Sequence, residues 1–311
     1  MKTPTWVHQI WENPPDPVVF FFPVMADVNM RKFETKLLVI SLAFFASLFV
    51  FCASYFVSYT FVTFRSRLRP KEKVFWCLSF VRALFGLVST FIGFWYIAFD
   101  DTLQKDVVNG NSQTSFLAVY IAVGFFIFEC TALFSSIAMF GGFDAFLVAH
   151  HTLSLLGFGT VAYCETTHFF SVVGMLLEMT TPFSCLCWMF LKAGMAHLPI
   201  WKINQILLVH LFHCRTTIEG YFYYKLYMQW ENVHHHMPRP IFWMLVVQLT
   251  LQFFILTPYW TYKKMGQLFN PVDWNHPELQ KNKSDSKNGV TDVTGSSPKK
   301  SKSKKGLKKE N

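Results

Sequence analysis

Charged residues are scarce in this chain, and their scarcity excludes an ordinary soluble domain. Only 15% of the 311 residues are charged, whereas 52% are hydrophobic and 18% are aromatic. The apolar residues form long runs, which is the composition of a membrane protein. A span needs roughly 20 mostly apolar residues, and backbone groups in lipid must bond internally, so helices are expected. We therefore predict an all-α polytopic membrane protein.

Features of secreted and nucleic-acid-binding proteins are also missing. The seven cysteines lie in or beside apolar runs without the spacing of a disulfide framework, so we expect them to be small buried side chains. No basic segment precedes an apolar core and a cleavage site, so no removable signal peptide is expected. The net charge is +9, but residues 281–311 hold ten Lys against three acidic residues. A nucleic-acid partner is therefore not expected.

Seven apolar segments are long enough to span a bilayer. They cover residues 37–64, 74–99, 116–140, 143–164, 168–191, 203–227 and 241–262. The segment at 203–227 is the weakest prediction, because it contains His210, His213, Arg215 and Glu219.

Loop charges predict the orientation of these spans. Residues 65–73 contain five basic residues against one Glu, which places this loop in the cytosol. Alternation then puts the N-terminal segment, residues 1–36, in the lumen and the C-terminus in the cytosol. The first span is 37–64, a larger helical domain covers 65–276, and the polar tail at 277–311 is predicted to be disordered.

The tail ends with a candidate sorting signal. Lys308 and Lys309 are the fourth and third residues from the end. They resemble the dilysine signal that binds the COPI coat, which works only in the cytosol. We expect residence in the endoplasmic reticulum membrane and the ER–Golgi intermediate compartment.

Several ionisable side chains fall inside the predicted spans, where such groups are costly and often functional. They are Arg82, Glu129, His150, His151, Glu178, His210, His213, Arg215 and Glu219. A rise of ~1.5 Å per residue puts His150 and His210 about 9–10 Å, Arg82 about 12 Å, Glu129 about 16 Å and Glu178 about 20 Å from the cytosolic ends of their helices. We expect these groups to line a cavity that opens towards the cytosol.

Helical periodicity assigns these groups to inward-facing surfaces. His150 shares a face with Ser154 and Gly157. His210, His213 and Thr217 share another, and Arg215 can neutralise Glu219 four residues later. Two roles are equally open for Arg82. It can lie on a packing face with its charge paired, or it can contact an anionic substrate.

Three interpretations of the histidines stay open. They can be neutral groups that hold the bundle together through hydrogen bonds. They can bind a metal through His150, His151, His210 and His213, although di-iron lipid enzymes use about twice as many histidines. They can catalyse acyl transfer, in which an imidazole accepts a hydroxyl proton or the acyl group, and a carboxylate fixes its tautomer.

Residues 143–159, FDAFLVAHHTLSLLGFG, resemble the core of the TLC-domain family, which includes ceramide synthases. Four other motifs resemble its neuronal ceroid-lipofuscinosis branch: EKVFW at 72–76, LLEMTTPFSCLCWM at 176–189, VHLFHCR at 209–215 and PYWTYKKMGQLFNPVDWN at 258–275. The resemblance covers residues 60–276. It implies six helices around a lipid-accessible cavity, preceded by one extra helix.

The resemblance also implies roles for the site residues. In ceramide synthases the paired histidines are catalytic and acyl-CoA is the donor, so this role falls on His150 and His151, without a bound cofactor or metal. The D-x-x-D pattern of those enzymes is replaced here by Glu178 and Thr181. Ceramide synthesis is therefore not expected. We expect transfer of an acyl chain to another lipid or to a glycerophospho head group instead. The catalytic candidates are His150, His151, Glu178, His210 and His213. The substrate-binding candidates are Arg82, Glu129 and Thr181.

Three functions in support of lysosomes follow as hypotheses. The first is an acyl-CoA-dependent lipid acyltransferase. The second is a cycling receptor that exports lysosomal enzymes from the endoplasmic reticulum, and the third is a lipid sensor or transporter. Membrane lipids and the COPI coat are the expected partners, and a homo-oligomer stays open.

Overall fold

The computed structural model describes residues 16–61, 63–142 and 144–271, and every element within these ranges is helical. In chain order the elements are α2 (Pro17–Phe21), η1 (Pro23–Asp27), α3 (Phe33–Ser58), η2 (Thr63–Arg67), α4 (Pro70–Ala98), α5 (Asp101–Lys105), α6 (Gln113–Phe140), α7 (Ala145–Cys164), α8 (His168–Gly174), η3 (Met175–Thr180), α9 (Thr181–Lys192), α10 (Pro199–Met228), α11 (Trp230–His236), α12 (Arg239–Leu251), η4 (Gln252–Leu256) and α13 (Thr257–Phe269). The predicted tail at 277–311, with Lys308 and Lys309, lies outside the described residues, as does Phe143.

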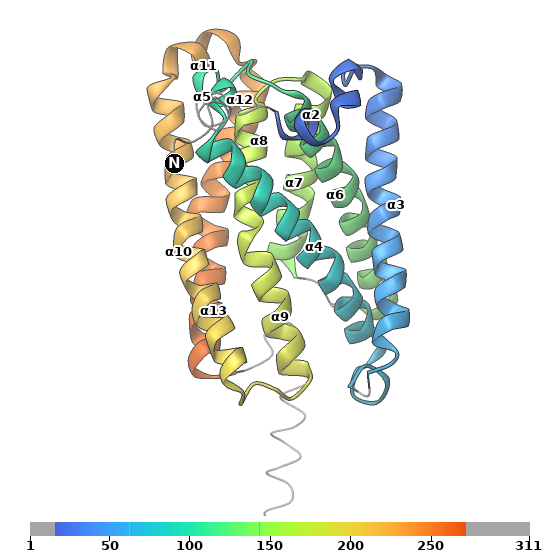
Figure 1. The fold of residues 1–311 in the computed structure, drawn as a ribbon. Helices are drawn as coiled ribbons and strands as arrows, with labels where there is room; N and C mark the ends of the chain where they lie inside the picture. Colours follow the sequence, from blue (N-terminus) through green and yellow to red (C-terminus); the bar gives the residue numbers. More distant parts are fainter. Residues whose placement is uncertain (1–15, 62, 143, 272–311) are drawn as a thin grey trace, which may run out of the picture. The chain divides into compact units, whose positions relative to one another are not determined.

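Six helical stretches of the described ranges are long and apolar enough to cross a membrane. They are Phe33–Ser58, Pro70–Ala98, Gln113–Phe140, Ala145–Cys164, His168–Lys192 and Arg239–Phe269. They match six of the seven predicted segments and confirm an all-α, multi-pass membrane fold. The segment at 203–227 forms α10, whose 30 residues are long enough to span but too polar to meet the same standard. Figure 1 shows α10 running along the bundle, and it packs against α9 and α13.

The helices begin where the sequence supplies capping groups. Pro70 is the first residue of α4, and the Glu72 carboxylate accepts the Arg69 N–H at 2.9 Å. Asp144 caps α7 by accepting the amides of Phe146 and Leu147 at 3.1 Å each. Asp144 therefore fixes the start of the helix that holds the paired histidines.

The helix α6 lies at the centre of the bundle and α3 lies at its edge. Within its most apolar stretch, 67% of the residues of α6 are buried, compared with 11% for α3. The helix α6 packs against both α3 and α7, and Figure 1 shows α4 crossing the bundle obliquely. Much of the apolar surface of α3 therefore faces lipid, as expected of an extra helix outside the family bundle.

One end of the bundle gathers basic side chains. Lys71 Nζ donates to the Gly141 carbonyl at 2.9 Å, and Lys192 forms an ion pair with Glu72. Lys71 and Lys192 belong to loops predicted to be cytosolic, so the fold brings these basic segments to one end of the bundle, as the predicted alternation requires.

Loops interlock at the opposite end, which is predicted to face the lumen. Lys36 Nζ lies 2.6 Å from Glu165 Oε1, and Asn232 Nδ2 donates to Asp106 Oδ1 at 2.9 Å. Burial tends to raise the pKa of Asp106, but hydrogen bonds from the Asn109 amide and the Asn232 side chain hold it below its ordinary value. The exposed His234–His236 stretch forms the end of helix α11.

The cysteines follow the prediction in part. All seven are free thiols, and Cys77, Cys130, Cys185 and Cys187 are buried as expected. Cys52, Cys164 and Cys214 are exposed instead. Cys52 and Cys164 lie on apolar helices, where lipid is as suitable a neighbour for a thiol as a protein core.

Candidate functional site

Two adjacent histidines, His150 and His151, lie two turns into α7. Neighbouring helical residues point about 100° apart, so the rings diverge. Their centroids are 5.3 Å apart, and both rings are largely buried. Each ring faces a different carboxylate, which gives the two side chains separate surroundings.

His150 faces Glu178. The distance from His150 Nε2 to Glu178 Oε1 is 3.6 Å, and Thr181 Oγ1 donates to the other carboxylate oxygen at 2.6 Å. Glu178 is therefore held between the imidazole and a hydroxyl. Thr181, predicted to bind substrate, acts here on Glu178.

A break in the fifth span positions Glu178. Pro182 has no N–H with which to bond the Glu178 carbonyl in an α-helix. The chain tightens into the 3-10 segment η3, and the Thr181 amide bonds that carbonyl instead. A Cβ at Gly86 would approach Pro182 Cδ to 2.8 Å, so glycine allows α4 to pack closely against this break.

His151 faces a buried ion pair. Arg82 Nε lies 3.1 and 3.0 Å from the two oxygens of Glu129, and Arg82 Nη2 lies 2.7 Å from Oε2. His151 Nε2 is 3.9 Å from the same Oε2. Arg82 and Glu129 therefore satisfy each other as a buried ion pair, and His151 lies beside this pair.

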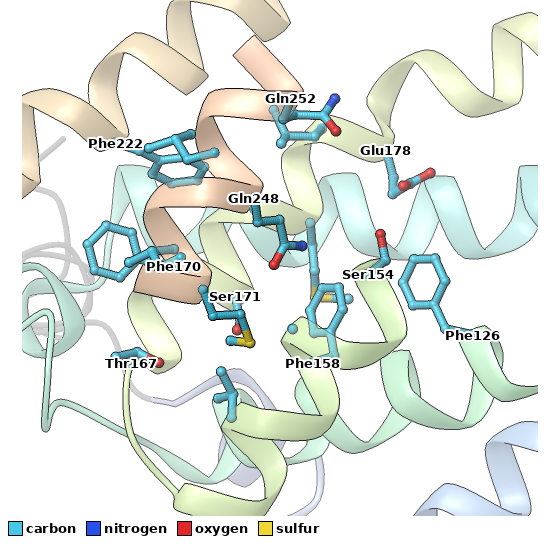
Figure 2. Close-up of a pocket in the computed structure, with 18 of the residues that line it drawn as sticks. Phe126, Ser154, Phe158, Thr167, Phe170, Ser171, Glu178, Phe222, Gln248 and Gln252 are labelled. Atoms are coloured by element: carbon cyan, nitrogen blue, oxygen red, sulfur yellow. The ribbon is translucent and has the colours of Figure 1, made fainter. Parts of the chain in front are cut away.

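A cavity of about 120 Å³ lies beside His150 and Glu178. Its lining comes from α4, α6, α7, α8, η3, α10, α12 and η4: Phe85, Phe126, His150, Ser154, Gly157, Phe158, Val161, Thr167, Phe170, Ser171, Gly174, Met175, Leu177, Glu178, Arg215, Phe222, Ile241, Met244, Leu245, Gln248, Leu249 and Gln252. Figure 2 shows the Gln248 side chain in the middle of this space, with Ser171 on one side and Ser154 and Phe158 on the other. The polar groups therefore sit within mostly aromatic and aliphatic walls.

The cavity extends from His150 away from the end of the bundle that is predicted to be cytosolic. From His150 it follows α7 through Ser154 and Val161 to Thr167 and Ile241, which lie where α8 and α12 begin. That end of the bundle is predicted to be lumenal. The body of the cavity therefore lies on the predicted lumenal side of His150, and the side on which it opens stays a prediction.

The predicted site residues separate into three groups. His150 and Glu178 line the cavity. His151, Arg82 and Glu129 form the buried cluster beside it, and Thr181 holds Glu178. His210 and His213 are exposed on α10 and do not join either group.

The inward face predicted for His210, His213 and Thr217 is wrong. All three side chains are exposed, and His213 Nδ1 lies 2.8 Å from the Val209 carbonyl of its own helix. Arg215 and Glu219 occupy the buried face instead. No group of three or more His, Cys, Asp or Glu that could hold a metal occurs in the described part of the chain.

Three residues at the cavity or next to His150 were not predicted to belong to the site. Gln248 and Gln252 line the cavity from α12 and η4, and two amides four residues apart in an apolar run were the available signal. Trp260 packs edge-on to His150, with ring centroids 5.3 Å apart.

Comparisons with known proteins place this site within a recognised domain. The family model for the TLC domain matches residues 75–265, which include all the residues of the cavity and of both histidine–carboxylate pairs. Protein CLN8 of Rattus norvegicus is 38% identical over 266 residues, covering 85% of this chain and 92% of that protein. Protein CLN8 of Homo sapiens is 39% identical over 243 residues, with 78% and 84% covered. TLC domain-containing protein 4-B of Danio rerio is 26% identical over 143 residues, with 46% and 53% covered. No solved structure matches the chain.

Proposed function

Because this chain belongs to the TLC-domain family, as the motif at 143–159 predicted, we propose that it is an acyl-CoA-dependent lipid acyltransferase. The observation that supports this proposal is the pairing of His150 with Glu178 in the wall of a buried, mostly apolar cavity. A general base with an orienting carboxylate is what transfer of an acyl group to a hydroxyl requires.

Glu178 orients His150. If the Nε2 proton points at the carboxylate, Nδ1 has the lone pair and is the basic nitrogen. The Thr181 hydroxyl holds the second carboxylate oxygen, so Glu178 cannot readily turn away. His151 is the weaker candidate, because it does not line the cavity and faces a carboxylate already bound to Arg82.

The proposed reaction balances without a further reagent. The acceptor hydroxyl attacks the thioester carbonyl while its proton moves to His150 Nδ1. The carbon–sulfur bond then breaks, and the CoA thiolate receives that proton. The products are an acyl ester and free CoA. In the predicted orientation, the acyl chain extends along the apolar body of the cavity and CoA lies towards the cytosolic end.

The size of the cavity adds a requirement. A volume of about 120 Å³ is close to the ~150 Å³ of an engineered cavity that binds benzene, so a long acyl chain requires wider space. The side chain of Gln248 occupies the middle of the cavity (Figure 2). Because a side chain rotates more easily than backbone moves, rotation of Gln248 is the simplest way to widen the cavity.

The test is transfer of a labelled acyl chain from acyl-CoA to lipids by purified protein in vesicles. We expect His150→Ala to abolish transfer. His210→Ala removes an exposed histidine and is the matched control, which should keep wild-type activity. No transfer by folded wild-type protein across a broad lipid panel would contradict the proposal and favour the cycling receptor for lysosomal enzymes or the lipid sensor.

We further propose residence in the endoplasmic reticulum membrane and the ER–Golgi intermediate compartment, with the C-terminus in the cytosol. Lys308 and Lys309, as a COPI-binding signal, support this location together with the loop charges. Such a location suits an enzyme that supplies lipids to lysosomes, and it suits the receptor hypothesis equally.

A further inference from the structure

One guanidinium nitrogen of Arg215 has no partner within the described part of the bundle. Its Nε lies 3.4 Å from Glu219 Oε1, and its Nη1 donates to the Leu177 carbonyl at 3.0 Å. Its Nη2 has no hydrogen-bond partner within the part of the chain that the structure describes, although Arg215 is only 3% exposed. Such a buried guanidinium N–H without an acceptor is costly, as is Glu219 Oε2 of the same ion pair, which also has no partner among the described residues. An acceptor on a bound ligand would satisfy the guanidinium.

The other contacts of Arg215 hold it rigidly. Glu219, its carboxylate partner, also accepts a hydrogen bond from Thr257 Oγ1 at 2.6 Å, and Gln252 Nε2 donates to Thr257 at 3.1 Å. These groups tie α10 to the π-helical turn η4 and to the start of α13. The guanidinium is therefore preorganised and does not need to reorient when a ligand binds.

Arg215 lies in the same part of the bundle as the residues proposed to carry out the reaction. It lines the same cavity as His150 and Glu178, and it bonds the carbonyl of Leu177, the residue before Glu178. Its Cζ lies 5.5 Å from the Trp260 ring centroid, and His150 packs on the same indole at 5.3 Å. Among the described residues that line this cavity, it is the one Lys or Arg.

We propose that Arg215 Nη2 binds the thioester carbonyl oxygen of the acyl donor and stabilises the negative charge that develops there as the hydroxyl attacks. This inference rests on the proposed function and adds a catalytic residue to it. The charge develops next to His150, where a fixed cationic donor in a dry site is most effective. Glu219 keeps the guanidinium in place and neutralises it when the cavity is empty.

The test uses binding of two unreactive CoA analogues to purified protein in nanodiscs. An S-(2-oxoalkyl)-CoA has a carbonyl next to the sulfur-bound carbon, and an S-alkyl-CoA of equal chain length has none. We expect wild type to bind the oxo analogue roughly tenfold more tightly, the effect of one hydrogen bond to a charged donor. Arg215→Gln combined with Glu219→Gln should bind both analogues equally, because it removes the cation without leaving an unpaired carboxylate.

Controls separate this role from a structural one. Lys36→Gln with Glu165→Gln neutralises an ion pair at the other end of α7 and should keep the tenfold preference. Thermal unfolding identifies any variant that fails to fold. Arg215→Lys retains the charge and should keep part of the preference even if the double variant is unstable.

The outcomes distinguish the two proposals. Equal binding of both analogues by wild type, or a preference that survives in the folded double variant, would overturn the assignment of Arg215 and leave the acyltransferase proposal standing. Binding of neither analogue by folded wild type would contradict the use of acyl-CoA itself, and the assignment of Arg215 with it.

Discussion

Adjacent histidines have different surroundings in this protein. His150 lines the cavity and faces a carboxylate bonded to a threonine, whereas His151 faces a carboxylate neutralised by arginine. The sequence identifies both as intramembrane ionisable groups but does not rank them. The difference arises because they point to different faces of α7 and therefore meet different neighbouring helices.

Thr181 provides a test at the residue scale. Thr181→Val keeps the shape of the side chain but removes the hydrogen bond to Glu178, so we expect kcat to fall roughly tenfold, equivalent to about 1.4 kcal/mol, with KM little changed. Thr181→Ser retains the hydroxyl and should restore most of the rate. Acyl-transfer kinetics in vesicles measure both. Equal losses in the two variants would indicate a packing role instead.

The sequence predicts which spans contain buried polar groups, because such a group is isolated in an apolar run, but it does not predict the direction in which each group points. His150 and Glu178 were found by their depth, and they lie together. His210 and His213 were found in the same way, but they face outwards. Lipid and protein core are equally apolar, so the apolar residues of α10 do not reveal which side faces the bundle. Gln248 was missed because an uncharged amide stands out less.

At the scale of elements, two of the predicted spans are not continuous α-helices. The fifth contains the 3-10 segment η3 before Pro182, and the seventh contains the π-helical turn η4. The proline made the first break predictable. Pro258 marks the second in the same way, because it has no N–H with which to bond the Phe254 carbonyl, and Gln252 and Thr257 pack around Glu219 at this turn. Both breaks lie beside the cavity, where such irregular turns often serve function.

Close packing of α4 against the first break gives a prediction for this element. A Cβ at Gly93 would approach Leu176 Cγ to 2.7 Å and the Leu176 backbone nitrogen to 2.9 Å. Gly93→Ala should therefore destabilise the fold by roughly 1–3 kcal/mol and displace η3, which lowers acyl transfer.

Thermal unfolding of the purified protein measures this effect, and Gly159 provides the matched control. A Cβ at Gly159 meets no heavy atom within 4 Å, so Gly159→Ala on α7 should be neutral or stabilising. An equal loss of stability in both alanine variants would contradict close packing of α4 as the cause.

At the scale of the whole molecule, six of the seven predicted apolar spans and the family were predictable, whereas the direction of the cavity was not. Runs of apolar residues identify spans because the bilayer fixes their length. The cavity depends on which faces of α7, α8 and α12 meet, and that information lies in tertiary packing. The prediction placed the polar groups in one layer, and the structure adds an apolar space that continues from His150 to Ile241.

The central claim is that an acyl chain lies in this space with its thioester at His150. Its most direct test is photolabelling of the reconstituted protein by acyl-CoA with a diazirine in the middle of the chain, mapped by peptide mass spectrometry. We predict labels on Phe170, Ser171, Met244 and Leu245 that excess unlabelled acyl-CoA suppresses. Labels confined to exposed side chains of α3, such as Phe45 and Phe49, and unaffected by competitor would contradict the account.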